Sequence, residues 1–413
     1  MAYLVGIVLF ALAIFVFVCL HEAGHMLTAK AFGMKVTRYF AGFGPTVFSF
    51  RRGETEYGLK ALPLGGFVKI VGMTPQDDDV APEDQPRAMW RFPVWQRTVV
   101  MAAGSVTHFI LGFLLLWVTL AFVGIPNPAA NDPARQPATV TVAPCVVATE
   151  DHVECTKDDV SPSPAQKAGL RDGDLITRFN GQPIHNYEDL VNAIRSTKPG
   201  PATMEYQRDG QTHTVTVDLV PALRHPMDNP NGKPTTVAAL GVTNQLPKGV
   251  PETITYGPVK ALGQSGKATV AIFGQMGAAL KNVPAKVPAL WDALNGKPRD
   301  PNTPVSVVGA TRLGGETAAH HAWSSFMSLL IVLNFFVGVF NLLPLLPLDG
   351  GHIAVLFYEK IRDWIRGLRG KPAGGPVDYT KLSAVTMVFI FIGGAVMLLT
   401  ITADIVNPIR IGQ

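Results

Sequence analysis

A short motif near the amino terminus has the residue types of a hydrolytic metal site. His21, Glu22 and His25 occur in the sequence His-Glu-Ala-Gly-His. On a helix, two histidines four positions apart lie on one face and can direct imidazole nitrogens at the same metal ion. The glutamate between them can reach a water molecule beside that metal. We therefore predict that His21 and His25 bind zinc and that Glu22 acts as a general base.

A second polar group of residues lies far along the chain, where an apolar stretch ends. It contains Asn341, Pro344, Pro347 and Asp349, and two glycines follow. A carboxylate at this place can supply a third zinc ligand, and three protein ligands leave one coordination position open, as in catalytic zinc sites. The prolines interrupt the helix and free backbone carbonyls. The alternative is that Asp349 only caps a helix or marks a membrane boundary.

The elements that must position these residues are membrane helices. Hydrophobic residues make up 47% of the 413 positions, charged residues make up 16%, and the formal net charge is +4. Such a weak, scattered charge excludes nucleic acid as a partner. Ionisable residues inside a span are costly and mark functional sites, so the first motif indicates chemistry inside a bilayer. Four segments are long and apolar enough to span it: 2–29, 98–123, 324–348 and 382–403.

Basic residues predict the orientation in a plasma membrane. Ten lysines and arginines lie between positions 26 and 97, and six more lie between positions 352 and 381. Loops rich in these residues face the cytoplasm, so residues 124–323 are predicted to lie outside. His25 is only about 7 Å along the helix from Lys30. The metal site is therefore predicted in the cytoplasmic half of the membrane.

Together these residues resemble the site-2 proteases, which are intramembrane zinc metalloproteases. The resemblance covers nearly the whole chain and is to the bacterial, regulator-of-sigma-E-protease-like branch, of the actinobacterial kind, with four spans and an extracytoplasmic PDZ insert. It implies that His21, His25 and Asp349 bind zinc, that Glu22 is the general base, and that Asn341 holds an unwound substrate. It also implies that the substrates are single-span membrane proteins, such as anti-sigma factors already cut outside the membrane by another protease.

Residues 32–97 are predicted to contain hairpins and an interfacial segment. Three β-prone runs between positions 37 and 71 are separated by glycine-containing turns. In the resembled family this region is a sheet that re-enters the membrane beside the active site, and its edge can hold an extended substrate. The resemblance places Gly42 and Gly44 in its Gly-x-Gly loop and adds Pro344 to the substrate-binding residues. An ordinary cytoplasmic hairpin is the alternative.

The external segment begins with a proline-rich linker, and a compact module follows at residues 138–221. The sequence KAGLRDGDLITRFNGQPI, residues 167–184, resembles PDZ domains, which bind extended tails or strands at a sheet edge. The module is predicted to filter substrates by size or to bind trimmed peptide ends, and a spacer is the alternative. Cys145 and Cys155 also lie outside, where an oxidising compartment permits a disulfide; two free thiols are the alternative.

Two further regions leave alternatives open. Residues 253–287 are predicted to form an amphipathic helix, either on the outer membrane face or packed on the PDZ-like module. In the second span, Gly104 is followed by serine, and His108 stands where members of the resembled family commonly carry asparagine. His108 is a candidate hydrogen-bonding partner behind the metal site, a proton carrier or a substrate contact. A packed core histidine is the alternative.

The predicted fold is a polytopic α-helical membrane protein with four transmembrane helices, a membrane-associated β-hairpin region and an inserted α+β PDZ domain. The predicted function is zinc-dependent cleavage of membrane proteins, with Zn2+ as cofactor and with membrane lipid and PDZ-bound peptides as further partners. An inactive PDZ-bearing scaffold and a zinc transporter are the alternatives, and Glu22 argues against both because neither needs a general base. The predicted segments are 1–31, 32–97, 98–124, 138–221, 222–323, 324–351, 352–381 and 382–406.

Overall fold

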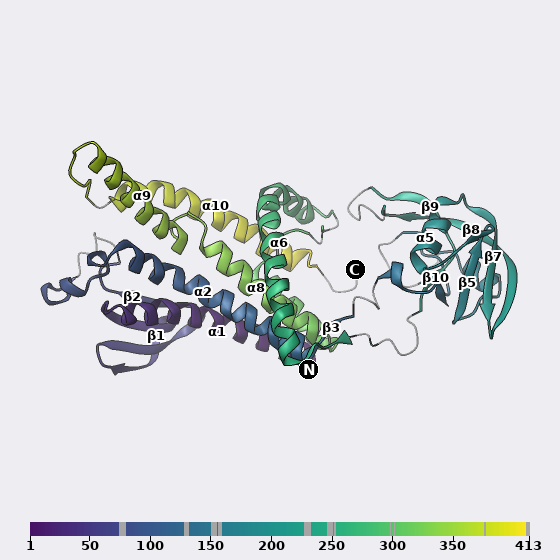
Figure 1. Ribbon diagram of the computed structural model, residues 1–413, viewed down its shortest axis with the longest axis horizontal. Coiled ribbons are helices and arrows are strands. Elements are labelled where there is room, and N and C mark those ends of the chain that lie inside the picture. Colours follow the sequence, from purple (N-terminus) through teal and green to yellow (C-terminus); the bar gives the residue numbers. More distant parts are fainter. Residues whose placement is uncertain are drawn as a thin grey trace. The chain divides into compact units, whose positions relative to one another are not determined.

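The chain forms two compact units, which are drawn in Figure 1. One contains Met1–Val123 and Thr255–Ile411, and the other contains Gly124–Ile254. Residues 128–131 of the predicted linker lie outside the part of the chain that is described. The computed structural model describes residues 1–73, 80–127, 132–149, 155, 159–226, 233–245, 251, 253–297, 299–300, 302–375 and 377–409.

Four helices of the first unit are long and apolar enough to cross a membrane, as expected of a multi-pass membrane protein. Their apolar side chains are largely exposed in the structure, and lipid is the solvent that favours such a surface. The helices are α1 (Ala2–Ala31), α2 (Val94–Val118, continued by the π-helix η3, Thr119–Val123), α8 (Trp323–Asn341) and α10 (Tyr379–Val406).

Small residues bring the first three of these helices close together. A side chain at Gly24 of α1 would meet the carbonyl of Ala103 on α2 at 2.8 Å, and one at Gly112 of α2 would meet the ring of Phe335 on α8 at 2.9 Å. Glycine at these positions therefore permits the close helix packing that is common in membranes. The result is a tight α1–α2–α8 group that contains both histidines of the first motif.

The predicted β region is one bent two-stranded ribbon, formed by β1 (Val36–Arg52) and β2 (Thr55–Ile70). Because both strands bend, residues 38–41 of β1 pair with residues 66–69 of β2 on one side and with residues 56–59 on the other. The bend requires glycine at position 42, where φ is +91° and a side chain would meet the carbonyl of Leu62 at 2.8 Å. The short helices η1 (Pro82–Arg87) and η2 (Met89–Arg91) then lead to α2.

The region around the second motif differs from the prediction in two ways. The third span, predicted to reach residue 351, ends at Asn341, and Asp349 begins a separate helix, α9 (Asp349–Leu368). The predicted loop at residues 352–381 is therefore mainly helix. Its sequence is amphipathic, with Leu356 buried and Lys360 exposed, and an apolar stripe of this kind stabilises a helix against its neighbours.

Residues 222–323 also differ from the prediction because they belong to both units. The amphipathic helix exists as α6 (Gly257–Leu294), but it packs against α2, α8 and α10 in the first unit. Phe273 of α6 contacts the rings of Phe109 and Phe335, with centroids 5.1 and 5.4 Å away. A second helix, α7 (Val307–Ala319), packs on α1 and was not predicted. Its Gly314 and Gly315 let the two backbones approach.

The second unit is an antiparallel sheet in the order β10-β4-β5-β7-β8-β9, with β6 paired to β5. The predicted boundary at residue 221 is wrong because it cuts β8, and the sheet continues to Asn244. Ala238 and Leu240 from this continuation complete the core around Leu190. The elements are β4 (Thr139–Val142), α4 (Pro164–Lys167), β5 (Asp174–Phe179), β6 (Gln182–Pro183), α5 (Tyr187–Ser196), β7 (Gly200–Arg208), β8 (Gln211–Arg224), β9 (Thr235–Ala239) and β10 (Val242–Asn244).

Three further features complete this unit. The short strands β3 (Ile125–Pro126) and β11 (Thr253–Ile254) pair where the chain enters and leaves it. A 3-10 turn, η4 (Pro133–Arg135), precedes β4. Cys145 and Cys155 are joined by a disulfide bond in the structure.

Candidate metal centre

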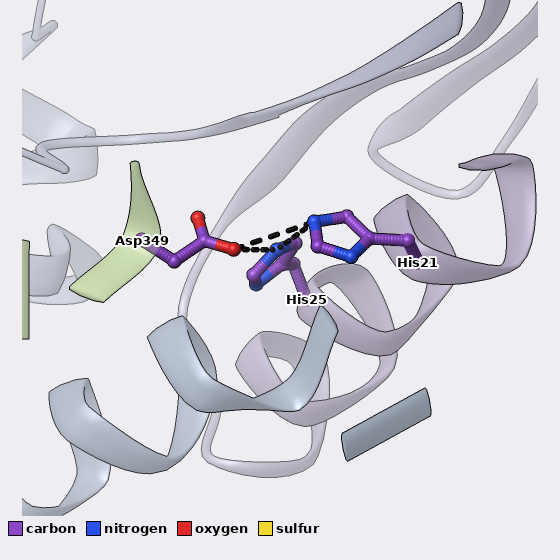
Figure 2. Close-up of side chains that lie close together, drawn as sticks. All are labelled: His21, His25 and Asp349. Atoms are coloured by element: carbon purple, nitrogen blue, oxygen red, sulfur yellow. Dashed lines mark hydrogen bonds and ion pairs between the residues drawn. The ribbon is translucent and has the colours of Figure 1, made fainter. Parts of the chain in front are cut away.

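Three side chains from distant parts of the sequence converge at one point, as Figure 2 shows. His21 and His25 come from α1, and Asp349 comes from the first turn of α9. The two Nε2 atoms are 3.1 Å apart, and the Oδ2 atom of Asp349 lies 3.3 Å from His21 Nε2 and 3.4 Å from His25 Nε2. Among the described residues, this is the one group of three histidine, cysteine or acidic side chains placed to share a metal ion.

The spacing of these three atoms matches zinc coordination. Tetrahedral ligands with zinc–ligand bonds of about 2.0–2.1 Å lie roughly 3.3 Å from one another, and the observed separations are 3.1, 3.3 and 3.4 Å. Asp349 Oδ2 is buried and has no hydrogen-bond partner in the described part of the chain. Asp349 is the first residue of α9, and its carboxylate lies within ion-pair distance of both histidines. The residues therefore fit a zinc ion.

Helix α2 supports both histidine rings from behind. The backbone carbonyl of Val100 lies 2.7 Å from His25 Nδ1, so it can accept the Nδ1 proton and leave Nε2 free to bind a metal. Gly104 lies one turn further along α2, and a side chain there would come within 2.4 Å of His21 Cε1 and of His25 Nε2. Only glycine leaves room for both rings at this position.

Glu22 lies between the metal-site histidines and the β ribbon. The backbone of Val68 on β2 hydrogen-bonds its carboxylate, and a side chain at Gly66 would come within 3.3 Å of Glu22 Cγ. The hydroxyl of Tyr39 on β1 donates to the carbonyl of Cys19 at 2.7 Å. Burial raises the pKa of Tyr39 to about 12, so the hydroxyl stays protonated. These contacts hold the ribbon against α1, directly beside Glu22, the candidate general base.

The predicted substrate-binding residues occupy different places. Asn341 is the last residue of α8 and is half-buried. Pro344 lies in the loop between α8 and α9 and lines a groove of about 660 Å3 that reaches α10. Gly42 is buried at the ribbon's bend, whereas Gly44 is exposed two residues further on. The two glycines therefore shape the ribbon. Asn341 and Pro344 lie at the start of the loop between α8 and α9, which places Asp349 at the metal centre.

The structure adds one polar partner that sequence reasoning missed. His108 of α2 is 3% exposed, and its Nδ1 atom lies 2.9 Å from Oδ1 of Asn334 on α8, which is 1% exposed. A signal for Asn334 was present, because an amide inside an apolar span seven residues before Asn341 lies on nearly the same helical face. Gly104 and the Val100 carbonyl were also missed as parts of the site, because their roles depend on how α2 approaches α1.

Comparisons with known proteins agree with this geometry. The model of peptidase family M50 matches residues 9–400. The chain is 44% identical to the zinc metalloprotease Rip1 of Mycolicibacterium smegmatis over 99% of both chains. It is 41% identical to the zinc metalloprotease Rip1 of Mycobacterium tuberculosis over the full length of both chains.

Proposed function

The chain belongs to peptidase family M50, and on that premise we propose that it cleaves single-span membrane proteins within the bilayer, anti-sigma factors among them. It is a multi-pass membrane zinc metalloprotease. The observation that carries the proposal is the convergence of His21, His25 and Asp349 beside Glu22. An inactive scaffold and a zinc transporter have no comparable support, because the relatives are metalloproteases and the ligand set forms one cluster.

We assign zinc binding to His21, His25 and Asp349, and proton transfer to Glu22. When bound, zinc polarises a peptide carbonyl and lowers the pKa of a water molecule toward neutrality. Glu22 accepts the proton of the attacking water and delivers it to the leaving nitrogen, which is the work of a general base and then a general acid. The hydrogen bond from Val68 holds the Glu22 carboxylate in place for both transfers.

The edge of β2 is the proposed place for the substrate backbone. Within the described part of the chain, residues 66–70 pair with a strand, β1, on one side only, and Val68 on this segment contacts Glu22. A substrate helix must unwind before hydrolysis because its carbonyls are occupied by its own hydrogen bonds. An unwound segment can add to the free strand edge, and the Asn341 side chain at the end of α8 can then hydrogen-bond its backbone.

We propose that the second unit works as a PDZ domain on the outer side, and that the metal centre faces the cytoplasmic side. The basic loops around positions 26–97 and 352–381 support this orientation. The second unit has a groove of about 420 Å3 between α5 and the β9–β10 segment, lined by apolar side chains and by Arg195 and Arg224. An apolar groove with arginines suits a peptide that ends in a carboxylate, as a trimmed substrate does.

The test is the Glu22→Gln variant of the full-length protein in detergent. We expect it to retain zinc, because His21, His25 and Asp349 are unchanged, and to lose cleavage of a tagged single-span anti-sigma substrate already trimmed outside. Glu83→Gln is the matched control, since this glutamate is exposed in η1 and its loss leaves the site intact.

Two results would refute the proposal. Equal cleavage by the wild type and by Glu22→Gln would show that Glu22 does not act as the general base. Absence of zinc from the purified, active wild type would refute the assignment of zinc binding to His21, His25 and Asp349. An inactive Glu83→Gln variant would show that the assay reports folding rather than catalysis.

A further inference from the structure

The two histidines of the metal centre are supported unequally. Nδ1 of His25 lies 2.7 Å from the carbonyl of Val100. Nδ1 of His21 is buried, and in the part of the chain that is described it has no hydrogen-bond partner. A histidine that binds a metal almost always donates its second N–H to an acceptor, which fixes the ring orientation and raises its basicity. His21 therefore needs an acceptor.

The side chain of Asn334 determines which nitrogen of His108 carries a proton. The amide Nδ2 of Asn334 donates to the carbonyl of Leu330 at 2.9 Å, and a carbonyl can only accept. The oxygen of Asn334 must then face His108 Nδ1, 2.9 Å away. Because this oxygen also only accepts, Nδ1 of His108 carries the proton. In the uncharged ring, Nε2 is left as an acceptor.

The position of His108 brings this acceptor to His21. Val100, Gly104 and His108 are spaced four residues apart on α2 and so lie along one face of the helix. The carbonyl of Val100 accepts a hydrogen bond from His25, and Gly104 makes room for both histidine rings. His108 lies against His21, with ring centroids 5.1 Å apart. This separation brings the two rings within reach of a nitrogen–nitrogen hydrogen bond, since imidazoles joined by one of about 3 Å have centroids roughly 5 Å apart, but the described structure does not itself form this bond.

We propose that His108 is a positioning residue whose Nε2 atom accepts a hydrogen bond from Nδ1–H of His21 once zinc is bound, with Asn334 setting the tautomer of His108. The proposal rests on the proposed function, because it requires His21 to bind zinc through Nε2. A series of hydrogen bonds through Leu330, Asn334, His108 and His21 then joins α8, α2 and α1 behind the metal. Removing such an acceptor typically weakens metal affinity about 10–100-fold.

The experiment compares His108→Leu with His108→Gln in the full-length protein. Zinc affinity is measured by competition with a chelator, alongside kcat, KM and the unfolding temperature. We expect His108→Leu to weaken zinc binding about 10–100-fold and to lower kcat more than it raises KM. His108→Gln should restore most of the affinity, because its Oε1 atom replaces the Nε2 acceptor. Asn334→Leu should resemble His108→Leu, because it frees His108 to take the other tautomer. The matched control is His320→Leu, at an exposed position at the end of α7.

Two outcomes would overturn the proposal. Wild-type zinc affinity in His108→Leu would show that another acceptor serves His21. Equal weakening by leucine and glutamine, together with a lowered unfolding temperature, would show that His108 only fills space between the helices. Failure of the proposed function is a separate outcome, because the wild type would then hold no zinc here, or Glu22→Gln would cleave normally in the cleavage assay described under the proposed function.

Discussion

Alanine in place of Gly104 should disable the metal centre without unfolding the helices. The added Cβ atom would lie 2.4 Å from His21 Cε1, 2.4 Å from His25 Nε2 and 2.6 Å from His21 Nε2. Atoms in favourable contact are about 3.5 Å apart, so each ring, or α2 itself, must move by about 1 Å. Zinc ligands tolerate deviations of about 0.2 Å. The two Nε2 atoms and Asp349 Oδ2 can then no longer share one ion.

The assay is zinc content per chain together with substrate cleavage, measured on the purified Gly104→Ala protein. We expect zinc below the stoichiometric amount and at least about a 100-fold loss of cleavage, since a 1 Å misplacement can cost that much. Alanine is a better helix former than glycine by about 1 kcal/mol, so a loss of helix cannot explain the result. Gly393→Ala is the control, because an added side chain in that part of α10 meets nothing within 4 Å. One zinc per chain and wild-type cleavage in Gly104→Ala would refute the reasoning.

Two predictions concern stability rather than chemistry. Replacing Cys145 by serine removes a disulfide between residues separated by 10 positions and should lower the stability of the second unit by about 2–3 kcal/mol, measured by denaturant unfolding under oxidising conditions. An unchanged midpoint would contradict this. Arg299→Leu leaves Asp404 of α10 buried without its 2.7 Å ion-pair partner, and both side chains are 2% exposed. A loss of about 3–5 kcal/mol is expected, and the double variant with Asp404→Leu should recover part of it. Additive losses in thermal unfolding would show that the two charges do not interact.

Local patterns in the sequence sufficed for the four apolar helices and for three of the four proposed site residues. The histidine spacing on an apolar helix placed His21, Glu22 and His25 together because a helix repeats every 3.6 residues, independently of the rest of the chain. Runs of apolar residues long enough to cross a bilayer coincide with four helices of the structure, because no other backbone form satisfies its hydrogen bonds in lipid without neighbours.

Predictions failed where pairing between distant segments decides the outcome. The boundary at residue 221 was wrong because β9 and β10 join the sheet from beyond it, and short strands of this kind carry little local signal. Helix α7 was missed because its glycines disfavour a helix locally, whereas its packing on α1 depends on those glycines.

The sequence by itself determined the membrane character, the metal chemistry and the residue types that perform it, since hydrophobicity, helical spacing and ligand preference are local properties. Only the tertiary structure decided that Asp349 reaches the histidines, that Gly104 gives their rings room, and that Asn334 orients His108 behind them. These contacts join α1, α2, α8 and the start of α9, which are far apart in the chain. Their distances depend on how the helices pack, and packing is a property of pairs of surfaces that neither sequence segment specifies alone.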